Sequence, residues 1–149
     1  MILSDFKVFP RNGRLIGIDW GARRTGIAVC DDSREFIFVR PVIVVKKTAE
    51  LVDKIVDLVK SEHAVGIVIG VPLRTDGTES ETTNMVRDFA DGLAQKTDLP
   101  IIFVDEVLSS STAMEQMGRA TVRDIKEKLD SESARVILEN AIAIIKRNL

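Results

Sequence analysis

One segment of the sequence limits the possible folds more than any other. Residues Val65–Val71 form an apolar run in which polar and apolar side chains do not alternate. Such a strand is typical of a sheet buried on both faces, as in a parallel sheet with helices on both sides. Leu99–Asp105 is another apolar strand. We therefore expect an α/β protein with parallel strands in its sheet.

The segments on either side of Val65–Val71 predict the order of the elements. Three strands joined by short turns come first, which favours an antiparallel meander. These strands are Arg14–Trp20, Thr25–Cys30 and Glu35–Val45. Helical spacing begins at Thr48, which is expected to cap a helix. Further helices are predicted over about 79–96, over 109–117 and over 131–147, and residues 118–129 are expected to form a polar, mobile loop.

Composition excludes several classes of protein. A chain of 149 residues with 45 % hydrophobic and 30 % charged residues is typical of one globular domain, here residues 1–149. No apolar run approaches the roughly 18–20 residues of a membrane span, and Asp5 and Lys7 interrupt any signal peptide. Cys30 and His63 are the only cysteine and histidine, which excludes multi-cysteine and multi-histidine metal sites. We expect a cytoplasmic protein without a membrane partner.

Carboxylates stand at the predicted strand ends, where sites form in open α/β sheets. Asp19 closes an apolar strand, and its alternative role is to accept hydrogen bonds from the turn that follows. Asp105 and Glu106 end the last strand, where one of them could cap the next helix. Asp130 precedes the last predicted helix and is explained equally well as its cap. His63 is predicted at the opposite edge, which argues against a Ser-His-Asp arrangement.

Two loops could approach phosphate groups at the same edge. The hairpin Asp19–Gly26 contains two glycines and two arginines. Glycine lets the backbone approach an anion closely, and arginine pairs with phosphate oxygens. The loop Gly70–Thr78 leads from the buried strand into a helix start, which favours anions. It lacks the lysine motif of a Walker loop, so a P-loop NTPase is not supported.

Carboxylates without histidine or cysteine suit hard cations such as Mg²⁺ or Mn²⁺. Arginines and hydroxyl groups around them favour phosphodiester hydrolysis. Two ions about 3.5–4 Å apart would activate a water molecule and stabilise the leaving oxygen. The sequence therefore predicts a metal-dependent nuclease whose carboxylates provide charge and geometry.

Four motifs in this order resemble the YqgF family. They are Asp19-x-Gly21-x-x-Arg24-x-Gly26-x-Ala28, Gly70-x-Pro72-Leu73 with Asp76-Gly77-Thr78, Asp105-Glu106, and Leu129-Asp130-Ser131-x-x-Ala134. The family resembles Holliday-junction resolvases and is linked to maturation of the 5′ end of 16S ribosomal RNA. The resemblance implies an RNase H-like fold, with a five-stranded mixed sheet in the order 3-2-1-4-5 flanked by helices.

The resemblance also assigns roles to residues. Asp19, Glu106 and Asp130 are implied to be the catalytic residues and the ligands of Mg²⁺ or Mn²⁺, with two ions expected. The residues expected to contact nucleic acid are Arg23, Arg24, Arg74, Thr78, Ser109 and Ser110. One position departs from the pattern, because Val107 stands where the family commonly has arginine. This removes either a phosphate contact or a positive charge behind the site, and our hypothesis is that Arg74 compensates for it.

Three functions follow from these observations. The first is a metal-dependent endonuclease that matures pre-16S rRNA, with pre-rRNA and ribosomal particles as partners. The second is a junction resolvase acting on branched DNA, which needs two active sites related by a two-fold axis. The third is a non-catalytic nucleic-acid or ribosome-binding module, against which the three intact carboxylates argue. The length leaves no room for the second domain of an actin-like phosphotransferase. We expect a monomer or weak homodimer.

The charge balance bears on the choice of partner. The chain has 21 basic and 23 acidic residues, and its net charge of −2 disfavours nucleic acid. Basic residues are nevertheless concentrated in two segments. Residues 1–24 contain five basic and two acidic residues, and residues 118–129 contain four and two. We therefore expect nucleic-acid binding of modest affinity and strong salt dependence.

Overall fold

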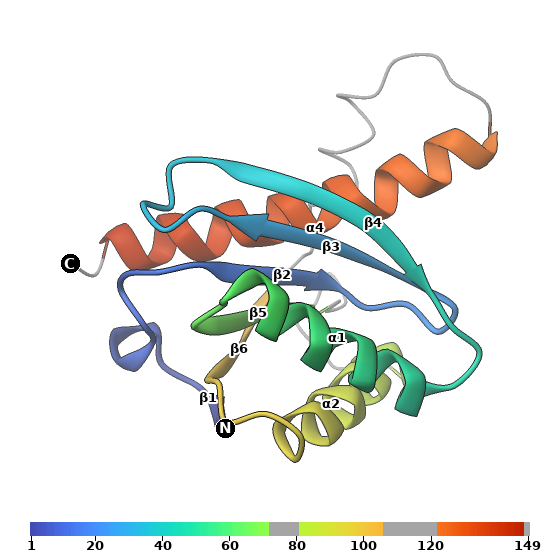
Figure 1. The fold of residues 1–149 in the computed structure, drawn as a ribbon, viewed down its shortest axis with the longest axis horizontal. Coiled ribbons are helices and arrows are strands. Elements are labelled where there is room, and N and C mark those ends of the chain that lie inside the picture. Colours follow the sequence, from blue (N-terminus) through green and yellow to red (C-terminus); the bar gives the residue numbers. More distant parts are fainter. Residues whose placement is uncertain (72–80, 106–121, 148–149) are drawn as a thin grey trace.

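A computed structural model describes residues 1–71, 81–105 and 122–147 of the chain, without the side chains at 81 and 122–131 (Figure 1). Its strands are β1 (Ile2–Leu3), β2 (Leu15–Asp19), β3 (Arg24–Cys30), β4 (Ile37–Val44), β5 (Gly66–Val71) and β6 (Ile101–Asp105). Its helices are η1 (Phe6–Val8), α1 (Thr48–Glu62), α2 (Glu81–Ala94) and α4 (Val122–Arg147). None of the helices in these ranges is long and apolar enough to cross a membrane.

The six strands form one mixed sheet in the order β1-β6-β5-β2-β3-β4. β2, β3 and β4 are the antiparallel meander, and β2, β5 and β6 are parallel neighbours. The order predicted for five strands is confirmed within this sheet, but their number was wrong. The sixth strand, β1, pairs in parallel with β6, and the amide of Ile101 donates to the carbonyl of Met1 at 2.8 Å. β1 could not be predicted from the sequence, because a strand of two residues is too short to show an alternating pattern.

Helices cover both faces of the sheet (Figure 1). One core lies between the sheet and helices α1 and α2, and it includes Ile18 and Ile69. The other core lies between the sheet and α4, and it includes Ala28 and Val68. Every residue of β5 is buried, as its unalternating apolar sequence predicts. Cys30 is packed in the α4-side core, where burial raises the pKa of its thiol.

Two helix starts differ from the sequence prediction. α4 begins at Val122, nine residues before the predicted start at 131, so Asp130 lies inside the helix and is not its cap. Residues 122–129 were expected to be a loop because they are polar, but their lysine, glutamate, arginine and leucine residues are good helix formers. α1 has Lys47 at its N-cap, with no side-chain hydrogen bond, so Thr48 is not the cap. The helix predicted over 109–117 lies outside the described residues.

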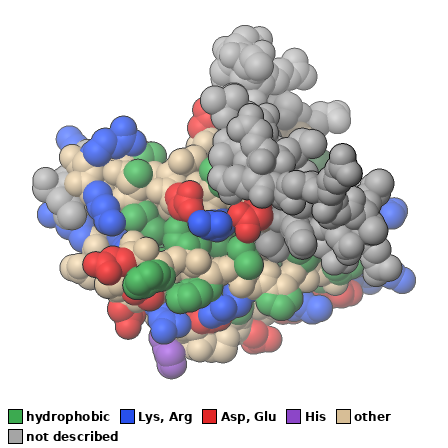
Figure 2. All heavy atoms as spheres, turned by 90° about the horizontal axis from the view of Figure 1, so that it is seen from above, with side chains coloured by type: hydrophobic (Ala, Val, Ile, Leu, Met, Phe, Trp, Pro, Cys, Tyr) green, Lys and Arg blue, Asp and Glu red, His purple; other side chains and the backbone are tan. Residues whose placement is uncertain are grey.

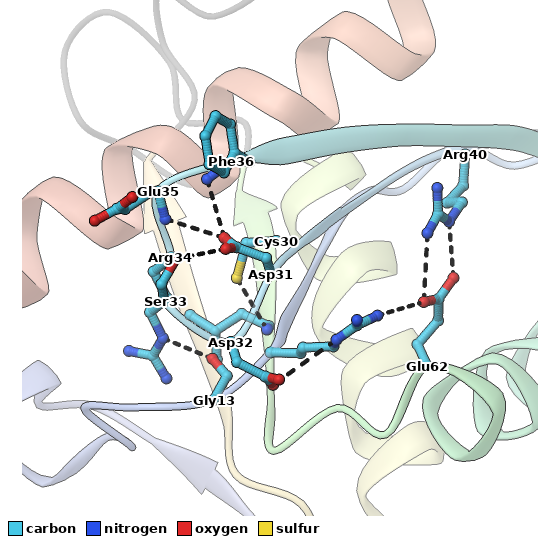
Figure 3. Close-up of polar contacts among 12 residues, drawn as sticks. Gly13, Cys30, Asp31, Asp32, Ser33, Arg34, Glu35, Phe36, Arg40 and Glu62 are labelled. Atoms are coloured by element: carbon cyan, nitrogen blue, oxygen red, sulfur yellow. Dashed lines mark hydrogen bonds and ion pairs between the residues drawn. The ribbon is translucent and has the colours of Figure 1, made fainter.

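A polar network holds the amino ends of the parallel strands (Figure 3). The buried guanidinium of Arg34 donates from Nε to the carbonyl of Gly13 at 2.8 Å and from Nη1 to that of Pro10 at 2.7 Å. Nearby, Glu62 of α1 accepts from Arg40 of β4 at 2.7 Å and from Arg14 at 3.3 Å. These groups join the N-terminal segment, the meander and α1, so we interpret them as structural.

The Glu62 ion pairs give a stability prediction. The hydrogen bond from Arg40 holds the pKa of Glu62 below its ordinary value. Its contribution is therefore present above the unfolded-state pKa and is lost as the pH falls through the folded-state pKa. We expect Glu62→Gln to lower the free energy of unfolding by about 1–2 kcal/mol at pH 7, and this difference to vanish in acid.

Urea unfolding followed by circular dichroism at several pH values measures this effect. Asp57→Asn, on the exposed side of the same helix, is the control and should change stability by less than about 0.5 kcal/mol. A Glu62→Gln difference that is the same at neutral and acid pH would contradict the linkage.

Candidate active site

The carboxyl ends of the three parallel strands lie next to one another. In the sheet register, Ile18 of β2 faces Ile69 of β5, and Val71 of β5 faces Asp105 of β6. Asp19 therefore stands at the end of β2, one step beyond the pair with Ile69. Neighbouring strands are about 4.8 Å apart, so Asp19 and Asp105 belong to one edge but are separated by the width of β5.

Asp19 and Asp105 lie on opposite faces of the sheet. A Cβ atom built on Gly17 would be 2.9 Å from the carbonyl oxygen of Ala134, so position 17 faces α4. Asp19 follows two residues later and shares that face. On β6, Val104 packs in the α4-side core, so Asp105 points to the other side and is exposed. This distinction was not made from the sequence.

The helix turn that carries Asp130 lies beside the end of β2. Asp130 precedes Ala134 by about one helical turn. Figure 1 shows that α4 runs antiparallel to β2, so its first half extends toward the carboxyl end of that strand. The backbone of Asp130 thus belongs to the α4 segment on the face of Asp19, while its side chain lies outside the described residues.

The β2–β3 turn is held by Thr25 and by a close backbone approach. The buried Thr25 hydroxyl donates to the carbonyl of Gly21 at 3.3 Å and accepts from the amide of Gly21 at 3.4 Å. A Cβ atom on Gly21 would lie 2.1 Å from the carbonyl oxygen of Arg24. The absence of a side chain at Gly21 is therefore required by the close backbone approach within the turn. Asp19 pairs with Gly26, so Arg24 lies diagonally across the ladder on the same face as Asp19.

The structure places only part of the predicted site. It describes Asp19, which is half-buried, together with the half-buried Arg24 and the exposed Arg23. The predicted residues outside the described ranges are Glu106, Arg74, Thr78, Ser109 and Ser110, together with Val107. Within the described ranges, no three His, Cys, Asp or Glu side chains are close enough to hold a metal ion. Of the predicted ligands, only Asp19 has a side chain within these ranges.

Two lysines were missed by the sequence argument. Lys46 and Lys47 follow β4 and lie beside the β2–β3 turn, because the amide of Val45 donates to the carbonyl of Arg23 at 3.1 Å. The available signal was a pair of lysines directly after an apolar strand. Local basic density does not reveal this neighbourhood, because the antiparallel pairing of β3 and β4 brings together positions that are far apart in the sequence.

The fold has close counterparts among solved structures. Thermus thermophilus RuvC in complex with a Holliday junction superposes with a TM-score of 0.59 at 12 % identity, covering 91 % of this chain and 97 % of RuvC. The yeast mitochondrial Holliday junction resolvase Ydc2 gives a TM-score of 0.56 at 12 % identity, covering 94 % and 82 %. This chain therefore has the RNase H-like fold of the RuvC-like resolvases, as the sequence predicted.

Sequence comparison identifies the family within that fold. The RuvX family, described as "Holliday junction resolvase", matches residues 13–143. A Maridesulfovibrio salexigens protein named "Putative pre-16S rRNA nuclease" is 38 % identical over 87 % of this chain and 98 % of its own length. A Pelagibacter ubique protein of the same name is 32 % identical over 94 % and 95 %. This chain belongs to the RuvX/YqgF family, which confirms the resemblance and agrees with a nuclease function.

The close approach at Gly21 gives a testable prediction. Gly21→Ala introduces a methyl group where the backbone oxygen of Arg24 already lies, so the turn must shift. We expect the free energy of unfolding to fall by about 1–3 kcal/mol, measured by thermal or urea unfolding.

Gly92→Ala is the matched control for this substitution. A Cβ atom on Gly92, in helix α2, would meet only Val52 at an ordinary 3.9 Å. The same chemical change should therefore stabilise the protein there, by about 0.5–1 kcal/mol. Equal effects of the two substitutions would show that the turn has no special steric requirement.

Proposed function

We propose that this chain is a metal-dependent endonuclease of one domain, residues 1–149, that hydrolyses a phosphodiester bond in maturing the 5′ end of pre-16S rRNA. The observation that carries the proposal is the position of Asp19. It lies at the carboxyl end of β2, on the face covered by α4, next to the helix segment that contains Asp130. The names of the RuvX/YqgF relatives support the substrate.

The metal ligands in this proposal are Asp19, Glu106 and Asp130. Carboxylate oxygens suit Mg²⁺ or Mn²⁺, and Asp19 is held half-buried at the end of a central strand. When bound, two such ions would activate water and stabilise the leaving oxygen. For Glu106, the sequence supports the choice, because this residue directly follows Asp105 at the carboxyl end of β6. Asp19 is kept in place by the β2–β3 ladder and by the parallel pairing of β2 with β5.

The remaining residues of the proposed site would bind and position the substrate. Arg24 lies diagonally from Asp19 on the same face, from which its guanidinium can contact a phosphate of the substrate. Arg23, Arg74, Thr78, Ser109 and Ser110 complete the proposed nucleic-acid contacts. The protein acts in the cytoplasm on pre-rRNA or ribosomal particles, as a monomer or weak homodimer.

A second function is supported by the family description and by the fold. Both point to resolvases, so branched DNA is the alternative substrate. The two functions share one cleavage chemistry and differ in the substrate. Incubation with Mn²⁺ and either pre-16S rRNA fragments or four-way DNA junctions separates them, because each predicts cleavage of only one substrate.

The central prediction is that Asp19→Asn strongly reduces cleavage and metal binding without unfolding the protein. We expect the cleavage rate to fall by about 10²-fold or more, as for other preorganised electrostatic groups. Metal binding can be measured separately, because Trp20 is the only tryptophan, the chain has no tyrosine, and Trp20 directly follows Asp19. Mn²⁺ should quench its fluorescence in the natural protein and much less in Asp19→Asn.

Asp105→Asn is the matched control, since Asp105 belongs to the same edge of the sheet but to the opposite face. It should keep both the fluorescence response and most of the cleavage. Loss of activity in Asp105→Asn with retention in Asp19→Asn would refute the assignment of the site to the α4 face. Absence of cleavage by the natural protein, with Mn²⁺ and on both substrates, would favour the non-catalytic binding module.

A further inference from the structure

A group of basic side chains lies beside the β2–β3 turn, and of this group only Arg23 belongs to the site described above. Arg24 at the start of β3 pairs with Val44 at the end of β4, and the next residues are joined by the hydrogen bond from Val45 to Arg23. This bond places the link between β4 and α1 against the turn. In Figure 1 both segments lie at the right end of the sheet, toward which β2 also points.

Three cations of this region are exposed: Arg23, Lys46 and Lys47, which we call the basic corner. Among the described residues, none of the three makes an ion pair. The other described lysines make no ion pair either, whereas three arginines do. Arg40 and Arg14 pair with Glu62, and Arg135 pairs with glutamates before and after it on α4. The basic corner therefore keeps its full positive charge toward solvent.

The centre of the surface in Figure 2 contrasts with the basic corner. There, acidic and basic side chains lie next to each other with hydrophobic side chains around them, while a group of basic side chains gathers at the left end of the same face. On α4, the guanidinium of Arg135 is 3.3 Å from Glu132 and 3.1 Å from Glu139. Paired charges of this kind attract a polyanion weakly, whereas cations without carboxylate partners attract it strongly and release counterions on binding.

The basic corner lies within reach of a strand bound at the proposed active site. Asp19 is opposite Gly26, and the amide of Val45 bonds to Arg23, which precedes β3 and lies three residues before Gly26 in the chain. Three residues of strand and two strand spacings amount to about 10–15 Å. A nucleic-acid strand advances about 3.4 Å per nucleotide in a duplex, so this separation corresponds to about three to four nucleotides.

We propose that the basic corner binds the phosphodiester backbone of the substrate, three to four nucleotides from the bond that is cut. This inference rests on the proposed nuclease function and extends it by Lys46 and Lys47, which neither the motifs nor the comparisons assign. The protein as a whole carries a net charge of −2, so a local cluster of cations is needed to hold a polyanion in register. Lys46 and Lys47 are positioning residues that do not touch the reacting atoms.

The test compares Lys46→Ala/Lys47→Ala with Lys54→Ala/Lys60→Ala. The second pair removes the same charge from exposed positions of α1 away from the corner. Binding of a labelled single-stranded RNA that spans the 5′ end of 16S rRNA is measured by fluorescence anisotropy in EDTA, at several salt concentrations. Cleavage of the same RNA is measured with Mn²⁺, and circular dichroism checks that each variant is folded.

Loss of two phosphate contacts should reduce the slope of log K against log salt by about 1.4, which corresponds to about 25-fold weaker binding at 0.1 M salt. We expect this change for Lys46→Ala/Lys47→Ala only, with a higher KM and an unchanged kcat. Lys46→Arg/Lys47→Arg should restore binding, because the charge is retained.

The two proposals fail in different ways. If the natural protein binds and cuts the RNA while Lys46→Ala/Lys47→Ala keeps the natural affinity and salt slope, the basic corner is refuted and the nuclease function stands. If both lysine pairs weaken binding equally, the effect is one of net charge and the corner is also refuted. If the natural protein cuts neither RNA nor DNA junctions, the nuclease function itself is refuted.

Discussion

The close packing of β2 against α4 is the contact on which the candidate site depends. Position 17 has room for a hydrogen atom only, since a Cβ there would lie 2.9 Å from both the Ala134 carbonyl oxygen and the Leu138 Cβ. Any larger side chain would push the helix outward, because packed interiors leave no free space for it. This contact brings the helix turn containing Asp130 next to the strand that ends in Asp19. Gly17 has no reactive side chain, but its small size lets two of the proposed ligands come close together.

The charged side chains at the two ends of the sheet have different partners. At the amino ends, polar groups are paired within the protein: Arg34 bonds to two carbonyl groups, and Glu62 bonds to two arginines. At the carboxyl ends, the half-buried Asp19 lies near the basic corner, whose cations make no ion pair among the described residues. Paired charges fasten segments together, whereas charges that face solvent remain available to a polyanion.

Much of the fold could be predicted from local pattern, and the errors have physical causes. The unalternating run of β5 was predicted to be buried on both faces, and it is. β1 was missed because two residues carry no periodicity, and its position depends on pairing with β6, far away in sequence. The start of α4 was placed too late because polarity was interpreted as a loop, although these polar residues favour helix.

The sequence by itself determined the types of element, the family and the candidate carboxylates, because periodicity and motifs are local properties of the chain. Only the tertiary structure separated Asp19 from Asp105, since the face on which a strand-end residue lies depends on which helix packs over it. It also placed Lys46 and Lys47 beside Arg23. That neighbourhood arises from antiparallel pairing, in which residues far apart in the sequence meet across a ladder, and no local pattern encodes it.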